Sequence, residues 1–135
     1  MTEKEEELQR KILEFQIFES ELRTIEGRED LLLRNLEEFN RTRLAIEELK
    51  NTKPDMALIP LGSSNFIHGK ITDSDTVIVG IGANIAVKKS KEHALEILDN
   101  RIKDLEHTSE KLASQAQNIF EKLRYLQIEI EKMQK

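Results

Sequence analysis

The sequence contains no cysteine and no tryptophan, and only two of its 135 residues are proline. Without cysteine the chain can form no disulfide, iron–sulfur cluster or cysteine-ligated zinc site, so we expect a reducing compartment. Aromatic residues make up 4% of the chain, whereas charged residues make up 35%. This is too little apolar material for a conventional globular core, and it predicts an elongated helical protein.

Long hydrophobic runs and an excess of positive charge are also missing. The longest apolar run, residues 76–87, contains two glycines and is well short of the roughly 20 residues that span a bilayer. The chain begins with an acidic stretch where a secretory signal peptide would be basic. Its net charge of −5 disfavours sequence-independent binding to nucleic acid. We therefore expect a cytoplasmic protein that binds neither a membrane nor nucleic acid.

Residues 8–50 have the 3,4 spacing of apolar residues that is typical of a coiled coil. The seam positions are Leu8, Phe15, Phe18, Leu22, Ile25, Leu32, Leu36, Phe39 and Ile46. Thr2 and Glu5 form a capping-box pattern at the start, and Asn51 with Pro54 provides a stop. A helix of this length would extend about 70 Å, so we expect it to need a partner helix.

Ser90 is expected to cap a second helix, which has a cleaner seam. Its seam positions are Leu95, Leu98, Ile102, Leu105, Ser109, Leu112, Ala116, Ile119, Leu123, Leu126, Ile130 and Met133. Two helices of matching length joined by a short segment predict an antiparallel coiled-coil hairpin, with both chain ends at one tip. One register places Leu8 near Met133 and Ile46 near Leu95, although a slip of one heptad would also satisfy the pattern.

The segment between the helices is rich in glycine and β-branched residues and predicts two β-hairpins. The expected strands are residues 56–59, 66–71, 76–79 and 84–88, with reversals at residues 60–64 and 80–82. Because Val77, Ile78 and Val79 are apolar in succession, the third strand needs cover on both faces. We expect partner subunits to supply that cover, since the apolar seams of the two helices are buried against each other.

Isolated hairpins are marginal in water, and their open edges pair readily with other chains. We therefore expect the middle segment to be the site of assembly. The candidate assembly residues are Leu58, Ile59, Leu61, Phe66, Ile67, Ile71, Val77, Ile78, Val79, Ile81, Ile85 and Val87.

No group of residues in the chain points to catalysis or to a bound ion. Gly80-Ile81-Gly82 lacks the lysine, the third glycine and the following helix of a phosphate-binding loop. Asp73 and Asp75 lack the rest of an EF-hand ligand set and are more typical of a capped turn. We therefore expect no enzyme activity, no cofactor and no metal site.

Apolar residues outside the seam are concentrated at the tip. Single exposed apolar residues are common on soluble proteins, but a local concentration of them tends to mark a binding site. Near a frayed coil end, neighbouring seam residues would join them. The candidate binding residues are Leu8, Ile12, Leu13, Phe15, Ile17, Leu123, Tyr125, Leu126, Ile128, Ile130 and Met133.

Several short motifs in the middle segment are distinctive. They are Ile59-Pro60-Leu61-Gly62-Ser63-Ser64, Gly69-Lys70-Ile71, Thr76-Val77-Ile78-Val79-Gly80-Ile81-Gly82, Val87 and Ala94. With these motifs and its two coils, the chain resembles the alpha-class subunit of archaeal-type prefoldin over essentially its whole length. Asn65-Phe66 and Asn84-Ile85 depart from the family's pattern, which affects details of strand packing.

The resemblance implies a mainly helical single domain, with coiled-coil helices at residues 1–52 and 90–135 and two β-hairpins at residues 53–89. It also implies a hexamer of two alpha and four beta subunits, whose hairpins join into intersubunit β barrels. Prefoldins bind unfolded polypeptides at their coil tips without nucleotide and deliver them to a group II chaperonin. The alternative is a coiled-coil scaffold or tether that assembles through its hairpins and has no chaperone activity.

Overall fold

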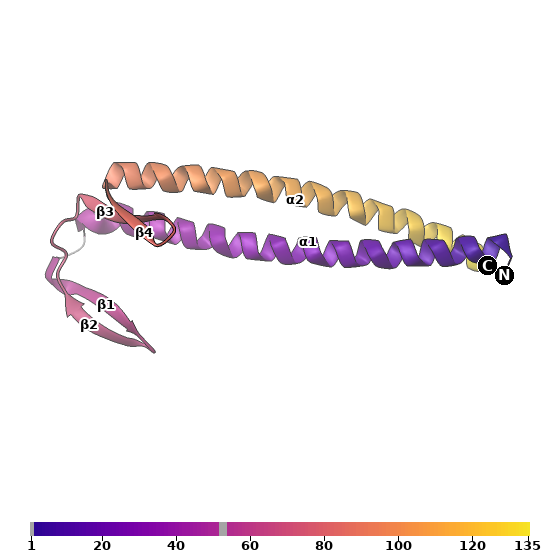
Figure 1. Ribbon diagram of the computed structural model, residues 1–135, viewed down its shortest axis with the longest axis horizontal. Helices are drawn as coiled ribbons and strands as arrows, with labels where there is room; N and C mark the ends of the chain where they lie inside the picture. The colour runs from indigo at the N-terminus through magenta and orange to yellow at the C-terminus, as the bar shows by residue number, and fades with distance from the viewer. Residues whose placement is uncertain (1, 52–53) are drawn as a thin grey trace. The chain divides into compact units, whose positions relative to one another are not determined.

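The structure is a computed structural model that describes residues 2–51 and 54–135. It contains two long helices joined through two β-hairpins (Figure 1). The elements are α1 (Glu3–Glu47), the 3₁₀ helices η1 (Glu48–Asn51) and η2 (Pro54–Met56), β1 (Ala57–Gly62), β2 (Asn65–Gly69), β3 (Thr76–Gly82), β4 (Ile85–Ser90) and α2 (Lys91–Gln134). The predicted mainly helical fold with two small hairpins is confirmed.

The chain divides into two compact units, and each has its own core. The coil unit comprises Met1–Leu36 and Asp104–Lys135, and the hairpin unit comprises Glu37–Lys103. The predicted boundary between the first helix and the hairpin segment, at residues 52 and 53, lies outside the described residues. Helix α1 ends three residues before the predicted Lys50, because η1 tightens the backbone after Glu47 into a 3₁₀ turn.

Both helices begin with the predicted side-chain caps. At α1, the backbone N–H of Glu5 donates to Thr2 Oγ1 at 3.2 Å, and the N–H of Thr2 donates to Glu5 Oε2 at 3.4 Å. At α2, the N–H of His93 donates to Ser90 Oγ at 3.1 Å. These bonds satisfy backbone donors that have no partner within the helix, and they fix where each helix starts.

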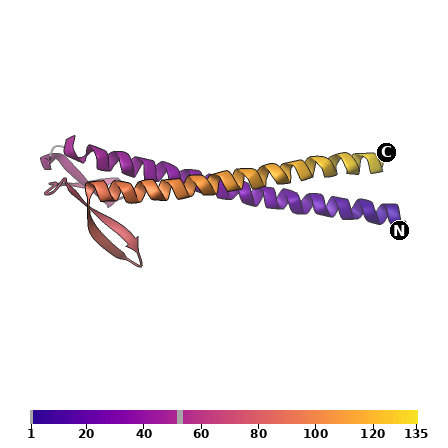
Figure 2. The same ribbon diagram turned by 90° about the horizontal axis from the view of Figure 1, so that it is seen from above.

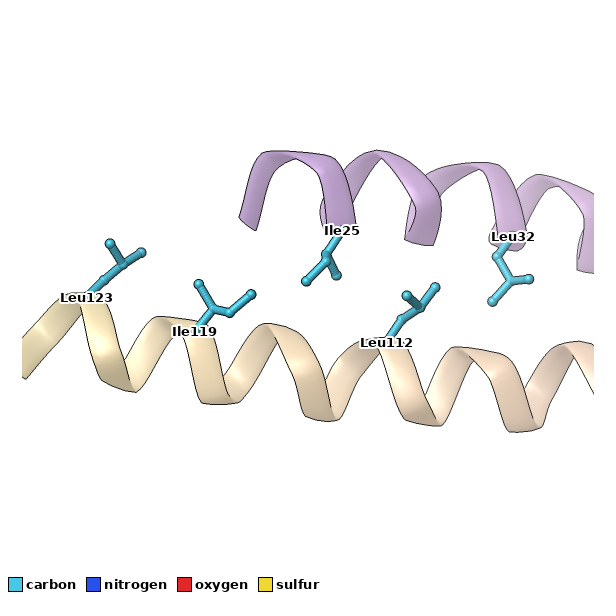
Figure 3. Close-up of a cluster of buried hydrophobic side chains, with 5 residues drawn as sticks. All are labelled: Ile25, Leu32, Leu112, Ile119 and Leu123. Atoms are coloured by element: carbon cyan, nitrogen blue, oxygen red, sulfur yellow. The ribbon is translucent and has the colours of Figure 1, made fainter. Parts of the chain in front are cut away.

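The core of the coil unit is the predicted seam. Ile25 and Leu32 of α1 point toward Leu112, Ile119 and Leu123 of α2 (Figure 3). The partly buried residues that pack against this cluster are Phe15, Phe18, Leu22, Leu105 and Ala116. Both chain ends lie at the same end of the unit (Figure 1, Figure 2), as an antiparallel coil requires.

Contacts within each unit select the predicted register. In the coil unit, Lys11 Nζ lies 3.6 Å from Glu129 Oε2. In the hairpin unit, Ile46 and Leu95 belong to one hydrophobic cluster. A slip of one heptad would move Leu95 about 10 Å along the helix axis from Ile46. The alternative register is therefore excluded.

Each hairpin is a two-stranded antiparallel ribbon that reverses over two residues. Ser63 and Ser64 connect β1 to β2, and Ala83 and Asn84 connect β3 to β4. All four residues have φ between 50° and 64°. Positive φ at both central residues is the pattern of a type I′ turn, which suits the right-handed twist of the flanking strands.

The reversal predicted at residues 60–64 contains the observed turn at Ser63 and Ser64. The reversal predicted at residues 80–82 is wrong in position, because Gly82 lies in a β-bulge and the turn follows it. Gly62 and Gly82 have φ of 108° and 107° and follow a shift in the strand register. Glycine adopts this backbone conformation at little cost, so the strand continues up to the turn. As a result β1 and β3 are longer than predicted, and β2 ends at Gly69.

Candidate functional site

The tip, which is the end of the coil unit that carries residues 8–17 and 123–133, exposes some of the predicted binding residues and buries others. The residues that are about half exposed or more are Leu13, Ile17, Tyr125 and Ile128. The half-buried residues are Leu8, Ile12, Phe15, Ile130 and Met133. Leu123 and Leu126 are buried in the seam at 8% and 5% exposure, so they become accessible only when the coil opens.

The exposed residues of the tip lie at similar positions along the coil axis but on different sides of the coil. With 3.6 residues per turn, Leu13 and Ile128 fall on the sides of their helices opposite the seam, so they face away from each other. Ile17 and Tyr125 lie closer to the flank of the coil that carries Lys122. Because the seam positions are already apolar, additional apolar residues can lie only outside the seam. The four exposed side chains therefore extend from the outer surface of the coil to that flank.

One groove of the tip, here called the lysine flank, is crossed by charged side chains. It has a volume of about 470 Å³, and its lining includes Glu14 and Phe18 of α1 and Lys122 and Tyr125 of α2. Lys122 Nζ lies 5.2 Å from the centroid of the Phe18 ring, within the range of a cation–π contact. The lysine of α2 thus covers the aromatic floor of this groove.

A second groove, here called the glutamine flank, lies on the other side of the seam. It has a volume of about 380 Å³ and a floor of three half-buried apolar residues, Ile12, Phe15 and Ile130. Its walls are Gln16, Gln127, Gln134, Glu19 and Glu131. This groove therefore combines an apolar floor with amide and carboxylate walls.

In the hairpin unit, the chain's own helices cover one face of β3. Val77 and Val79 pack against the buried cluster of Ile46, Ala94 and Leu98. The prediction that only partner subunits cover β3 is therefore wrong for this face. The prediction assumed that seam positions alone bury apolar groups, whereas Ala94, at 1% exposure, lies beside the seam and its small side chain lets the strand approach.

Polar contacts reinforce this packing. Arg43 Nε lies 2.6 Å from Asp99 Oδ1, and the same guanidinium also pairs with Glu47. The hydrogen bond from Arg43 holds the pKa of Asp99 below its usual range. Arg101 Nη2 donates to the carbonyl oxygen of Gly80 in β3 at 3.3 Å. These contacts join α1 to α2 and α2 to the hairpin.

The linker between the hairpins is the capped turn that the sequence predicts. Asp73 Oδ1 accepts the backbone N–H of Asp75 at 2.9 Å, and Asp73 Oδ2 accepts the Thr76 hydroxyl at 2.6 Å. The hydroxyl hydrogen bond lowers the pKa of Asp73. Both aspartates therefore serve the turn that leads into β3.

The other faces of the hairpins are open. Ile78 alternates with Val77 and Val79 and is 74% exposed. The remaining exposed apolar residues of the ribbons are Leu58, Ile59, Leu61, Phe66, Ile67, Ile81 and Ile85. Ile71 and Val87 are half-buried. Each ribbon has only two strands, so its edges present unpaired backbone groups beside this apolar surface.

Sequence reasoning missed the burial of Ala94 and the Arg43–Asp99 pair. Ala94 lies one residue outside the 3,4 spacing, so the periodicity gave no sign of its burial. The available signals were its place among the distinctive motifs and its small side chain in the first turn of a helix that follows directly from a strand. The pair joins residues 56 positions apart, which became neighbours only once the register was known.

The described residues contain neither a membrane-spanning helix nor a metal-binding cluster. No helix within residues 2–51 and 54–135 is long and apolar enough to cross a membrane. In the same part of the chain, no three histidine, cysteine, aspartate or glutamate side chains come together so that they could hold a metal ion.

Comparisons with known proteins agree with one another. Residues 18–135 match the family model described as Prefoldin subunit. Prefoldin subunit alpha of Thermococcus onnurineus (strain NA1) is 34% identical over 107 residues, which cover 77% of this chain and 72% of that protein. Prefoldin subunit alpha of Methanobrevibacter smithii is 29% identical over 121 residues, which cover 84% of this chain and 83% of that protein.

A solved structure shows the same fold. A chain of filamentous PFD from Methanocaldococcus jannaschii, determined by cryo-EM, matches with a TM-score of 0.75 at 21% identity and covers 85% of this chain and 96% of that chain. The similarity to this structure supports the fold. The match to the family model and the similarity to the relatives support membership of the family. The chain belongs to the prefoldin family.

Proposed function

We propose that the chain is the alpha-class subunit of a hetero-oligomeric prefoldin that holds unfolded polypeptides at its tips without nucleotide. Its family makes the chain a chaperone subunit. The observation that supports binding at the tip is the exposure of Leu13, Ile17, Tyr125 and Ile128 there. Each such contact is weak, and several tips in one oligomer gain affinity for the same polypeptide by avidity.

Assembly through the hairpins is the second part of the proposal. The chain joins a second alpha-class subunit and four beta-class subunits, and partner strands pair with the open edges of both ribbons. The exposed face of Ile78 and the exposed apolar residues of β1 and β2 support this role. A subunit with two hairpins contacts more neighbours than one with a single hairpin.

The destination of the bound polypeptide is the third part of the proposal. The oligomer delivers it to a group II chaperonin in the cytoplasm, and the acidic first turn of α1, with Glu3, Glu5 and Glu6, docks against a basic surface of the chaperonin. We expect the affinity for the chaperonin to fall as salt is added, because salt screens exposed charges. An affinity that does not change with salt would count against this docking.

The tip is tested by removing its exposed apolar side chains. The tip variant is Leu13→Ser, Ile17→Ser and Ile128→Ser, and the control is Leu31→Ser, Leu33→Ser and Leu44→Ser, which are equally exposed leucines of α1 away from the tip. We expect the assembled tip variant to lose most of its suppression of light scattering by a denatured enzyme diluted from guanidinium. The control should keep it.

Two results would contradict the proposal. Equal suppression by the wild type and the tip variant would remove the tip from polypeptide binding. Absence of any suppression by the wild-type oligomer would favour the alternative of a scaffold or tether. Such a scaffold should keep its partner and its role after deletion of the tip, since it is joined through its hairpins.

A further inference from the structure

We propose that the glutamine flank adds to the contacts of the exposed tip residues by taking one short extended apolar segment of the polypeptide, bordered by basic residues, and that the groove of the lysine flank takes no such segment. The inference rests on the proposed function and adds to it a side of the coil and a class of segment. It follows from what each flank presents to an incoming chain.

The lysine flank is occupied by the protein's own side chains. Lys122 covers the ring of Phe18 at 5.2 Å. Further along the same side of the seam, Lys11 pairs with Glu129 at 3.6 Å and with Glu7 at 4.0 Å. An apolar segment that entered here would have to displace the cation–π contact and leave these charges without their partners. Binding on this flank therefore starts at a disadvantage.

The glutamine flank offers free groups. Ile12, Phe15 and Ile130 are half-buried, so part of each apolar side chain faces the groove. Among the described residues that line it, no wall side chain makes an ion pair or a hydrogen bond. The wall glutamines are Gln16, Gln127 and Gln134. A primary amide both donates and accepts, so these side chains can pair with the unpaired backbone of an extended peptide.

The charge of the glutamine flank selects the kind of segment. Its lining includes Glu19 and Glu131 and, among the described residues, neither lysine nor arginine. Two carboxylates beside an apolar floor favour a segment with basic residues next to its apolar residues. From Ile12 to Glu19 the groove extends about 10 Å along α1, which corresponds to roughly three residues of extended chain. The site therefore accommodates about three extended residues.

The experiment reverses the charge of each flank in turn. The first variant is Glu19→Lys with Glu131→Lys on the glutamine flank, and the matched control is Glu14→Lys with Glu121→Lys on the lysine flank. Both change the net charge equally and place one substitution on each helix. Binding of two labelled peptides to the assembled full-length chain is measured by fluorescence anisotropy. Both peptides have a valine–leucine–valine centre, bordered by lysines in one and by glutamates in the other.

We expect the wild type to prefer the lysine-bordered peptide. The first variant should lose about tenfold in affinity for that peptide, since two exposed attractive contacts become repulsive, and it should gain affinity for the glutamate-bordered peptide. The control should change less than about twofold in either case. This pattern would assign polypeptide binding to the glutamine flank.

Other outcomes overturn the inference. Equal losses in both variants would indicate an effect of overall charge, and a loss confined to the control would place binding on the lysine flank. A changed oligomer mass in the first variant would show that the groove holds a second copy of the coil. A wild type that suppresses aggregation but binds neither peptide would refute the groove and leave the proposed function intact. A wild type that does neither would remove the proposed function itself.

Discussion

Replacing Ala94 by leucine tests whether the chain's own helices cover β3. Ala94 is the most buried of the described residues in the hairpin unit, at 1% exposure, and Val77 and Val79 of β3 pack against its cluster. A leucine at this position adds three carbon atoms where the structure leaves no exposed surface. We expect it to push β3 away from the helices or to force neighbouring side chains out of their preferred rotamers.

The expected loss can be separated from any effect on the helix itself. Overpacking a buried site costs about 1–3 kcal/mol, whereas an exchange of alanine for leucine in an exposed helix costs only a few tenths of a kcal/mol. Ala113→Leu is the matched control, because Ala113 lies on the exposed surface of the same helix. For a chain of this size, roughly 5–10 °C of the melting temperature should separate the two variants.

The measurement is urea and thermal unfolding of the full-length chain, followed by circular dichroism, with hydrogen exchange of the β3 amides as a second readout. Ala94→Leu should lower the midpoint and speed exchange in β3, and Ala113→Leu should change neither. Equal stability of the two variants, with unchanged exchange in β3, would refute the packing of β3 on the helices. The strand would then have to be covered by partners alone.

Three other predictions concern the hairpins and the ion pair between Arg43 and Asp99. Ile78→Lys should lower the mass of the assembly measured by light scattering, while the stability of the separated chain stays unchanged. Val79→Lys should lower both the mass of the assembly and the stability of the separated chain. The reverse pattern would mean that Ile78 faces the helices and Val79 faces the partners. Asp99 has its pKa lowered by the Arg43 hydrogen bond, so its contribution to stability is complete above its ordinary pKa near 4 and is lost as the pH falls. Asp99→Asn should therefore flatten the acid limb of a plot of stability against pH, and an unchanged limb would show that the pair contributes nothing. Ser64→Gly should stabilise the first hairpin by about 1 kcal/mol in urea unfolding, because φ at Ser64 is 64°; a destabilised variant would mean that the serine side chain is needed in the turn.

The helices and their register could be predicted because the 3,4 spacing of apolar residues repeats along the whole coiled coil. Each seam position between Leu8 and Met133 supports the others, so Ser109 could interrupt the pattern without obscuring it. The caps at Thr2 and Ser90 were equally readable, because a cap needs only a side-chain oxygen three residues before a backbone donor.

The hairpins were harder to predict because their turns use unusual residues. Ser63, Ser64 and Ala83 adopt positive φ, which side chains of these types rarely do. The second turn was predicted too early, at Gly80 to Gly82, although Gly82 belongs to a bulge and the turn follows it. A turn of this kind is defined by how two strands pair, and a single sequence carries little information on that pairing.

The sequence could indicate candidate residues for the tip, but not how they are arranged. The excess of apolar residues near the tip was visible from their spacing. Which of them face a groove depends on both helices at once: Ile12 lines the glutamine flank only because Ile130 lies across from it. The same dependence hid Ala94, whose burial requires a strand that arrives from another part of the chain.

The bulge that precedes each turn has a consequence for solubility. A bulge increases the local twist of a ribbon, and both hairpins carry one at the same distance from the turn. Strongly twisted ribbons suit a curved, closing sheet, whereas cross-β stacks need flat strands that repeat without limit. The exposed edges can therefore stay available to a few partner strands while their curvature opposes open-ended growth into fibrils.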